Sequence, residues 1–258
     1  MLVLPDRSIP MKIRSIEGFI PLLATSYVSG AQRTMSPGFT SRMDWYVKNR
    51  PELAAHLLEI NGDFFNPNLD HLLTVTPRKR LERMLRYMFD EEEFLSPYGI
   101  RSVSKCHEKH PYSYTVNGTV YSVDYEPGEG KTAMFGGNSN WRGPIWMPIN
   151  YMIIQSLKTY DHFYGESFLV EFPTGSGNKV TLGRAAELLA ERVASLFLPD
   201  AEGRRPLNGE DERYAIDPAW KDLVLFYEYF HGDNGKGLGA SHQTGWTALV
   251  AELLAKEV

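Results

Sequence analysis

The sequence predicts a mainly α-helical protein with short β-hairpins in the connections between helices. Apolar residues recur at helical spacing in several segments, proline or threonine stands where many of these segments begin, and strand patterns are few. With 258 residues, 43% of them hydrophobic and 23% charged, the chain has the composition of an ordinary globular protein with a sizeable core. No linker, low-complexity segment or long charge run interrupts it, so we expect one domain over residues 1–258.

The helices are predicted in order along the chain. Ile16–Tyr27 has a helical pattern that Pro21 interrupts, and Thr40 begins a segment that runs to about Lys48. Pro51 suits the first turn of the next helix, because the backbone N–H that proline lacks would have no hydrogen-bond acceptor there. The remaining helices are expected over 78–90 after Thr76-Pro77, from Pro144 or Pro148 to Phe163, over 182–197 after a Thr181 cap, briefly after Asp217-Pro218, and over 244–255.

Two hairpins are predicted between these helices. Residues 113–125 alternate around Asn117-Gly118, a pair that favours a two-residue turn between antiparallel strands. Residues 169–180 have a similar pattern with a longer turn.

Two glycine-rich segments stand out, Tyr125–Trp146 and Tyr227–Trp246. Each begins with Tyr-Glu, continues through Gly, Asn and Ser, and ends in tryptophan next to a predicted helix. Repeated loop-then-helix units favour an α/α toroid, in which helical hairpins close into a ring with their loops on one rim. The chain has too few helical segments for six hairpins, so we expect only a portion of such a ring.

These loops have the residues of a carbohydrate-binding surface. Glycine lets the backbone approach a ligand, aromatic rings can stack on sugar faces, and amides and charged groups bind hydroxyls. The candidate contacts are Trp141, Arg142, Trp146, Tyr229, His242, Gln243 and Trp246. Each tryptophan has core packing as its alternative, and Arg142 and His242 have structural roles as theirs. If residues 141–146 are helical, Trp141 and Trp146 cannot point the same way.

Composition argues against several other classes of function. The net charge of -5 argues against a nucleic-acid partner, and Cys106, the one cysteine, cannot form an intrachain disulfide. The first residues lack the apolar core of a signal peptide, and no apolar stretch is long enough for a membrane span. We find no metal-ligand spacing, and Gly128–Thr132 lacks the glycine spacing of a phosphate-binding loop. We therefore expect a cytoplasmic protein with no cofactor, metal, nucleic acid or membrane partner.

Residues 138–154 (NSNWRGPIWMPINYMII) and 226–246 (FYEYFHGDNGKGLGASHQTGW) resemble the C-terminal part of glycoside hydrolase family 63. This family comprises the processing α-glucosidases and relatives such as mannosylglycerate hydrolases. The short segments 13–24, 94–104 and 136–148 are similar to its bacterial glucosidase-like branch, so the resemblance covers essentially the whole chain.

The resemblance implies an (α/α)6 barrel that hydrolyses α-glycosidic bonds with inversion. The family's general base is a glutamate before a glycine-rich loop that closes in Gly-Trp, a pattern that falls here on Glu228, Tyr229 and Gly245-Trp246. Asp233 is the candidate second carboxylate, with Asp124 and Glu126 as further alternatives. The family's general acid lies in an upstream Asp-Asn motif, and we find none before residue 140.

We therefore expect the C-terminal portion of a glycosidase, with an oligosaccharide as substrate and the missing N-terminal part of the same enzyme as partner. The alternative is a carbohydrate-binding module or an inactive fragment. From the residues alone, Glu228 also fits a surface ion pair at the end of a helix.

Overall fold

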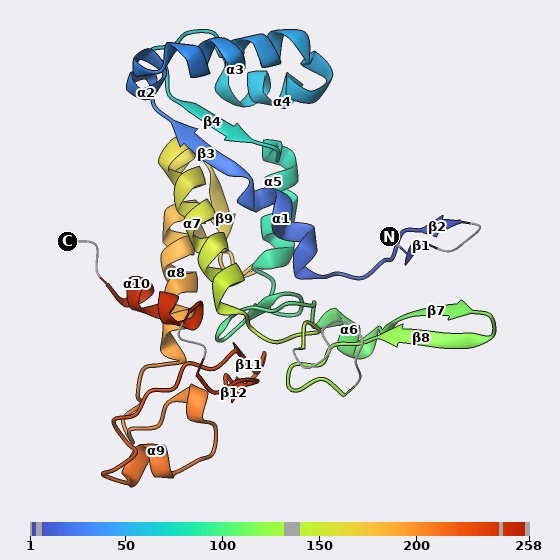
Figure 1. The fold of residues 1–258 in the computed structure, drawn as a ribbon, viewed down its shortest axis with the longest axis vertical. Coiled ribbons are helices and arrows are strands. Elements are labelled where there is room, and N and C mark those ends of the chain that lie inside the picture. Colours follow the sequence, from blue (N-terminus) through green and yellow to red (C-terminus); the bar gives the residue numbers. More distant parts are fainter. Residues whose placement is uncertain (1, 4–6, 132–139, 243–244, 256–258) are drawn as a thin grey trace. The chain divides into compact units, whose positions relative to one another are not determined.

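The computed structural model describes residues 2–3, 7–131, 140–242 and 245–255 (Figure 1). The described residues are rich in helix, and every sheet they form is a two-stranded antiparallel ribbon. The mainly α-helical class is therefore confirmed, and the closed ring of hairpins stays a prediction. The chain divides into two compact units, 1–18 with 91–148 and 192–258, and 19–90 with 149–191. The single domain over 1–258 likewise stays a prediction.

The unit of residues 19–90 and 149–191 contains most of the long helices. Its helices are α1 (Ile20–Leu23), α2 (Gly30–Met35), α3 (Pro37–Asn49), α4 (Pro51–Asn61), α5 (Arg78–Met88), most of α7 (Met147–Tyr164), η2 (Gly165–Ser167) and most of α8 (Leu182–Ser195). Its strands are β3 (Thr25–Val28), β4 (His71–Thr74), β9 (Leu169–Glu171) and β10 (Lys179–Thr181). Helices α3 and α4 lie side by side, as Figure 1 shows.

The core of this unit follows the apolar periodicity of its helices. Leu81, Leu85 and Met88 on one face of α5 are fully buried. Tyr160 of α7 is also buried, and its hydroxyl lies 2.7 Å from Thr74 Oγ1 and donates to the Leu22 carbonyl oxygen at 3.3 Å. These bonds satisfy a polar group that burial would otherwise penalise.

Two predictions near the start of this unit were wrong. Residues 25–28 form strand β3, paired with β4 in the register Thr25↔Thr74 to Val28↔His71, and not the end of a helix. The pairing partner is distant in sequence, so the helical pattern of Ile16–Tyr27 could not reveal it. Helix α3 begins at Pro37 instead of Thr40, because proline suits the first turn of a helix. The Thr40 hydroxyl does not cap the helix and donates to the Arg33 carbonyl oxygen in α2 (2.8 Å).

The unit of residues 1–18, 91–148 and 192–258 is built mainly from loops and short ribbons. Its helices are α6 (Cys106–Lys109), η3 (Pro206–Asn208), α9 (Arg213–Ile216), η4 (Thr247–Leu249) and α10 (Val250–Leu254), and η1 (Ile16–Phe19) begins in it. Its strands are β1 (Leu2–Val3), β2 (Ser8–Ile9), β5 (Leu95–Ser96), β6 (Gly99–Ile100), β7 (Tyr112–Val116), β8 (Thr119–Val123), β11 (Tyr229–Phe230) and β12 (Gly237–Leu238).

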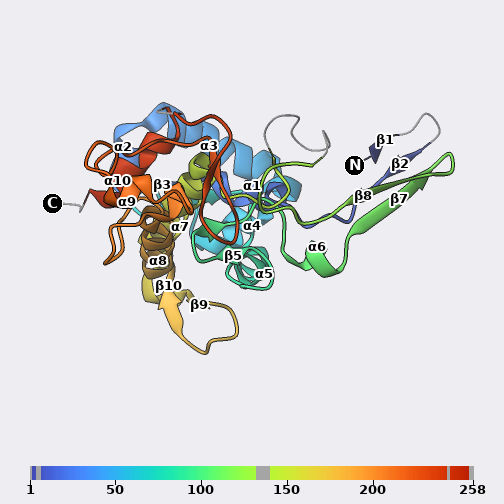
Figure 2. The ribbon, with the colours of Figure 1, turned by 90° about the horizontal axis from the view of Figure 1, so that it is seen from below.

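The predicted hairpins are confirmed. Strands β7 and β8 form a long ribbon, visible in Figure 2, whose turn residues Asn117 and Gly118 have φ of 49° and 82°. Positive φ at both positions is the signature of the turn that asparagine and glycine favour. Strands β9 and β10 form the second hairpin.

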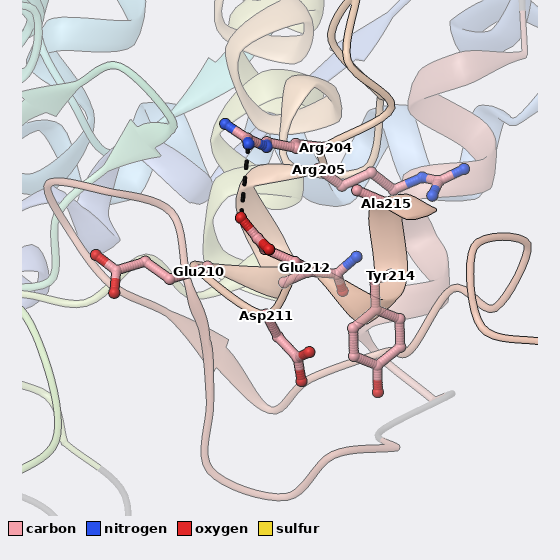
Figure 3. Close-up of a pocket in the computed structure, with 9 residues that line it drawn as sticks. Arg204, Arg205, Glu210, Asp211, Glu212, Tyr214 and Ala215 are labelled. Carbon is pink, nitrogen blue, oxygen red and sulfur yellow. Dashed lines mark ion pairs between the residues drawn. The ribbon is translucent and has the colours of Figure 1, made fainter. Parts of the chain in front are cut away.

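Two helix predictions in the C-terminal part needed correction. No helix begins at Asp217-Pro218; α9 instead ends at Ile216, and Asp217 is extended, as is usual for a residue before proline. The helix expected over 244–255 is shorter and consists of η4 followed by α10. Residues 204–215, which include η3 and α9, line a pocket (Figure 3).

Candidate functional site

The segments that the sequence analysis singled out lie side by side in one unit. Ile145 forms isolated β-bridges with both Arg101 and Phe230. Two backbone hydrogen bonds join Ile145 and Phe230, at 2.8 and 3.0 Å. The end of the first glycine-rich segment is thus fixed against the start of the second.

Glu228 lies in a loop whose two sides hydrogen-bond each other. Its N–H donates to the Ala240 carbonyl oxygen at 2.9 Å, and the Ala240 N–H donates to its carboxylate Oε2 at 3.1 Å. Trp246 Nε1 donates to the Glu228 carbonyl oxygen at 3.1 Å. Glu228 is half-buried, so both its backbone and its carboxylate are held in place without complete removal from solvent.

Gly239 makes room for this carboxylate. It has φ of +69°, and a Cβ there would lie 2.6 Å from Glu228 Oε2 and 2.8 Å from Tyr229 Cε1. Both the backbone angle and the close approach require glycine at this position.

A second carboxylate, Glu129, reaches the same turn from the first glycine-rich segment. Its Oε1 accepts a hydrogen bond from the Gly239 N–H at 3.2 Å, and its Oε2 accepts one from the Tyr229 hydroxyl at 2.6 Å. Consecutive amides, those of Gly239 and Ala240, therefore donate to Glu129 and Glu228 respectively. Burial, and then the bond to Glu129, raise the pKa of Tyr229. Glu129 was not predicted from the sequence, where its only signal was an acidic residue within a glycine-rich loop.

Aromatic rings stack beside Glu228. The ring of Trp146 stacks on Trp141 at 4.0 Å between centroids and 5° between planes, and on Tyr229 at 4.8 Å and 24°. Trp246 meets the edge of Trp146 at 6.0 Å. The segment 141–146 is not helical, and so the two tryptophans can stack despite their spacing.

Exposure separates the members of this stack. Trp146 and Tyr229 are 1% and 0% exposed, whereas Trp141 is half-buried and Trp246 is 37% exposed. In this structure a sugar could lie only on the exposed rings, and Trp146 and Tyr229 support them from beneath.

Arg142 is buried and ion-paired. Its Nη2 contacts Glu126 Oε2, and its Nη1 lies 3.8 Å from Asp124 Oδ1. The Asn140 amide donates to the carbonyl oxygens of Glu126 and Gly128, each at 2.7 Å. Arg142 therefore has the geometry of a structural salt bridge, the alternative to a sugar contact. The Asn140 bonds join the two ends of the first loop, as far as the structure describes it.

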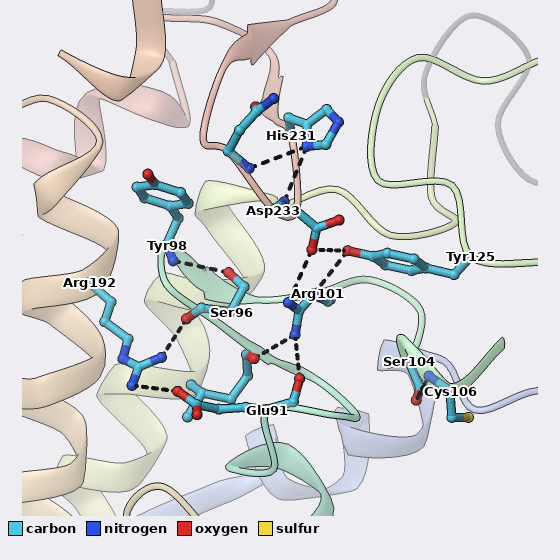
Figure 4. Close-up of polar contacts among 12 residues, drawn as sticks. Glu91, Ser96, Tyr98, Arg101, Ser104, Cys106, Tyr125, Arg192, His231 and Asp233 are labelled. Atoms are coloured by element: carbon cyan, nitrogen blue, oxygen red, sulfur yellow. Dashed lines mark hydrogen bonds and ion pairs between the residues drawn. The ribbon is translucent and has the colours of Figure 1, made fainter. Parts of the chain in front are cut away.

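The carboxylate of Asp233 is hydrogen-bonded within a polar cluster. Its Oδ1 accepts hydrogen bonds from Arg101 Nη2 at 3.1 Å and from the Tyr125 hydroxyl at 2.9 Å (Figure 4). Arg101 is 3% exposed, and burial raises the pKa of Tyr125. Asp233 therefore ties the second glycine-rich segment to the Arg101 segment. Its role as second carboxylate stays a prediction.

The remaining predicted contacts lie at the end of the second segment. His242 is exposed, and its ring stacks on Phe226 at 6.1 Å between centroids. Gln243 lies outside the described residues. Within the described parts of the chain, no group of three His, Cys, Asp or Glu side chains could hold a metal ion. Nor does any described helix have the length and apolarity that a bilayer span requires.

The chain is similar to one known protein family and to several known proteins. Residues 55–169 match the model of the glycosyl hydrolase family 63 C-terminal domain. The chain is 46% identical over 253 residues to an uncharacterized protein of Saccharomyces cerevisiae, a match that covers 97% of this chain and 23% of that protein.

Two glucosidases are more distant relatives. A mannosyl-oligosaccharide glucosidase of Saccharomyces cerevisiae is 29% identical over 178 residues, and a probable mannosyl-oligosaccharide glucosidase of Schizosaccharomyces pombe is 26% identical over 177 residues. Each match covers 69% of this chain and 15% of the relative. The chain therefore spans less than a quarter of the length of these proteins. The matches support a relation to glycosyl hydrolase family 63.

Proposed function

We propose that this chain is part of an inverting α-glycosidase of family 63, in which Glu228 is the general base. The observation that carries the proposal is the fixed, half-buried carboxylate of Glu228 beside a stack of aromatic rings. Such a carboxylate can hold a water molecule in one orientation, and exposed rings next to it can hold a sugar. The resemblance to the bacterial glucosidase-like branch and the (α/α)6 barrel belong to the same proposal.

In the proposed reaction Glu228 takes a proton from a water molecule while the water oxygen attacks the anomeric carbon. The bond from that carbon to the glycosidic oxygen breaks, and a general acid gives a proton to the departing oxygen. An inverting enzyme needs about 6.5–9.5 Å between its two carboxyl groups to accommodate the water. We infer that the acid comes from a segment outside these 258 residues, the proposed partner of this chain.

The other predicted residues take different roles in this proposal. Trp141 and Trp246 supply exposed ring surface, and His242 and Gln243 supply hydrogen bonds to sugar hydroxyls. Trp146 and Tyr229 support the rings from the interior, and Arg142 holds the first loop through Glu126 and Asp124. Glu129 is a positioning residue, because it binds the Tyr229 hydroxyl and the amide next to the one that holds Glu228.

The test replaces Glu228 with Gln in the longer protein that carries the rest of the predicted barrel. The amide keeps the size of the side chain but cannot accept the proton from water. We expect turnover of an α-linked glucose disaccharide to fall roughly 10²–10⁴-fold with little change in KM. NMR of the first product formed by the unmodified protein should show the β-anomer.

The matched control is Glu202→Gln, which removes an exposed carboxylate elsewhere in the same unit. It should leave turnover unchanged. Unaltered turnover in Glu228→Gln would remove Glu228 from the mechanism, and an α-anomeric product would contradict inversion.

A further inference from the structure

A pocket of about 440 Å³ lies between η3 and α9, in the same unit as Glu228 (Figure 3). Its volume falls in the range of about 300–1,000 Å³ that is typical of small-molecule sites. Its lining comes from residues 204–215 and consists mostly of polar or charged residues, with Gly209 and Ala215 among them. The proposed glycosidase mechanism makes no use of it.

Asn208 is the informative residue of this pocket. Its side chain is 7% exposed, and both Oδ1 and Nδ2 are buried without a hydrogen-bond partner among the described residues. Buried side-chain amides are nearly always paired, since an unpaired one costs free energy on folding. An amide that lines a pocket with its acceptor and its donors unused is ready to bind a ligand that carries both kinds of group.

The lining carries two arginines and three acidic residues, among them the exposed Glu210, so its charges nearly balance, and this indicates the kind of ligand. Asp211 forms an ion pair with Arg213 at 2.6 Å, and Glu212 lies 3.8 Å from Arg204. Arg205 is engaged with backbone, its Nε donating to the Phe197 carbonyl oxygen at 3.1 Å and its Nη1 to that of Lys221 at 3.0 Å. With no concentration of one sign of charge, the pocket suits neither phosphate nor a metal cation.

The wall of the pocket touches the loop that follows Glu228. Gly209 has φ of +57°, and a Cβ there would lie 2.9 Å from Lys236 Cδ. Lys236 directly precedes β12, which contacts η3. The wall of the pocket therefore packs against the same loop that holds the proposed base.

We propose that this pocket binds a sugar unit, with the Asn208 amide bridging two neighbouring hydroxyls. Nδ2 donates to one hydroxyl oxygen, and Oδ1 accepts from the other hydroxyl. The choice of a sugar over another neutral polyol rests on the proposed glycosidase function. The pocket itself rests on the unpaired amide and the balanced charges.

The test compares Asn208→Ala with the control Asn49→Ala, which removes an exposed amide from α3. Maltose is titrated into each protein, and the NMR shifts of the Asn208 side-chain amide and of the Gly209 and Ala215 backbone amides are followed. We expect these resonances to move in the unaltered protein and in Asn49→Ala, with binding at least roughly tenfold weaker in Asn208→Ala. Because Asn208→Ala removes an unpaired buried group, its Tm should be equal to or above that of the unaltered protein.

Three results would overturn the inference. Shifts produced only by inorganic phosphate or Ca²⁺ would assign the pocket to an ion, and no shift with about 0.1 M maltose would leave it without a sugar. A lowered Tm in Asn208→Ala with unchanged maltose binding would make Asn208 structural. Glu228→Gln separates this inference from the proposed function, since it should lower hydrolysis by the longer protein and leave the maltose shifts at Gly209 and Ala215 intact.

Discussion

Single residues decide the geometry around Glu228, and Gly239 is the clearest case. Gly239→Ala would place a Cβ 2.6 Å from the carboxylate oxygen of Glu228 in a backbone conformation that alanine disfavours. We expect a stability loss of about 1–2 kcal/mol from the backbone alone, and a further loss of activity because Glu228 must move. Chemical denaturation and turnover of an α-linked disaccharide by the longer protein measure the two effects.

Gly175→Ala is the matched control for this prediction. Gly175 has φ of +84°, but a Cβ at this position would meet no atom within 4 Å, so its substitution carries the backbone cost without the collision. It should lower stability and leave turnover intact. Equal turnover in the two variants would mean that the position of Glu228 does not depend on Gly239.

His231 gives the second glycine-rich segment a pH dependence. Its Nδ1 accepts hydrogen bonds from the N–H groups of Asp233 at 3.1 Å and Asn234 at 3.4 Å, which requires that nitrogen to be unprotonated. Burial lowers the pKa of His231, outweighing the opposite effect of Asp233. The unfolded chain therefore binds this proton more readily than the folded chain, so the contribution of His231 to stability declines as pH falls below about 6.5.

The measurement is an NMR titration of the His231 ring, with hydrogen exchange at the Asn234 amide. We expect a pKa below 6.5 and, at lower pH, a smaller protection factor for the Asn234 amide, that is, faster exchange relative to the intrinsic rate at the same pH. Site-resolved NMR is needed because burial also lowers the pKa of His71 in the other unit, which changes global stability with the same sign. A pKa for His231 above 6.5 would contradict the prediction.

At the scale of the element, local patterns were predictable and long-range pairings were not. The β7–β8 turn follows from Asn117-Gly118, because the dipeptide itself supplies the two positive φ angles. Strand β3 depends on a partner at 71–74, and nothing within residues 25–28 specifies that partner. In the same way, Glu228 was predicted from the resemblance of its segment to a family motif, whereas Glu129 joins it only through contacts that bridge the two loops.

The stack of Trp141 on Trp146 gives an element-scale prediction. Trp146 is buried between two rings, so Trp146→Ala should destabilise the protein by about 3–5 kcal/mol. Trp141 is half-buried, so Trp141→Ala should cost less stability and should weaken sugar binding instead. Thermal unfolding and maltose titration distinguish the two variants, and the reverse order of effects would exclude Trp141 as the sugar platform.

At the scale of the whole molecule, the proposed mechanism requires a second carboxyl group opposite Glu228. The glucosidase relatives are several times longer than this chain, which spans 15% of each. Within the chain, Asp233 is bound to Arg101 and Tyr125, and Glu129 is bound to Tyr229 and the Gly239 amide. Both carboxylates thus hold other groups in place, which favours an acid from a separate segment.

We therefore expect the 258-residue chain to bind maltose without releasing glucose. The longer protein should hydrolyse maltose, and Glu129→Gln should lower its kcat moderately while leaving both limbs of its pH profile in place, as befits a positioning residue. Glucose release by the 258-residue chain, abolished by Glu228→Gln, would place the acid among residues 1–258. In that case Glu129→Gln and Asp233→Asn would be compared. The variant that loses the limb of the pH profile assigned to the acid would identify which of the two carboxyl groups protonates the departing oxygen.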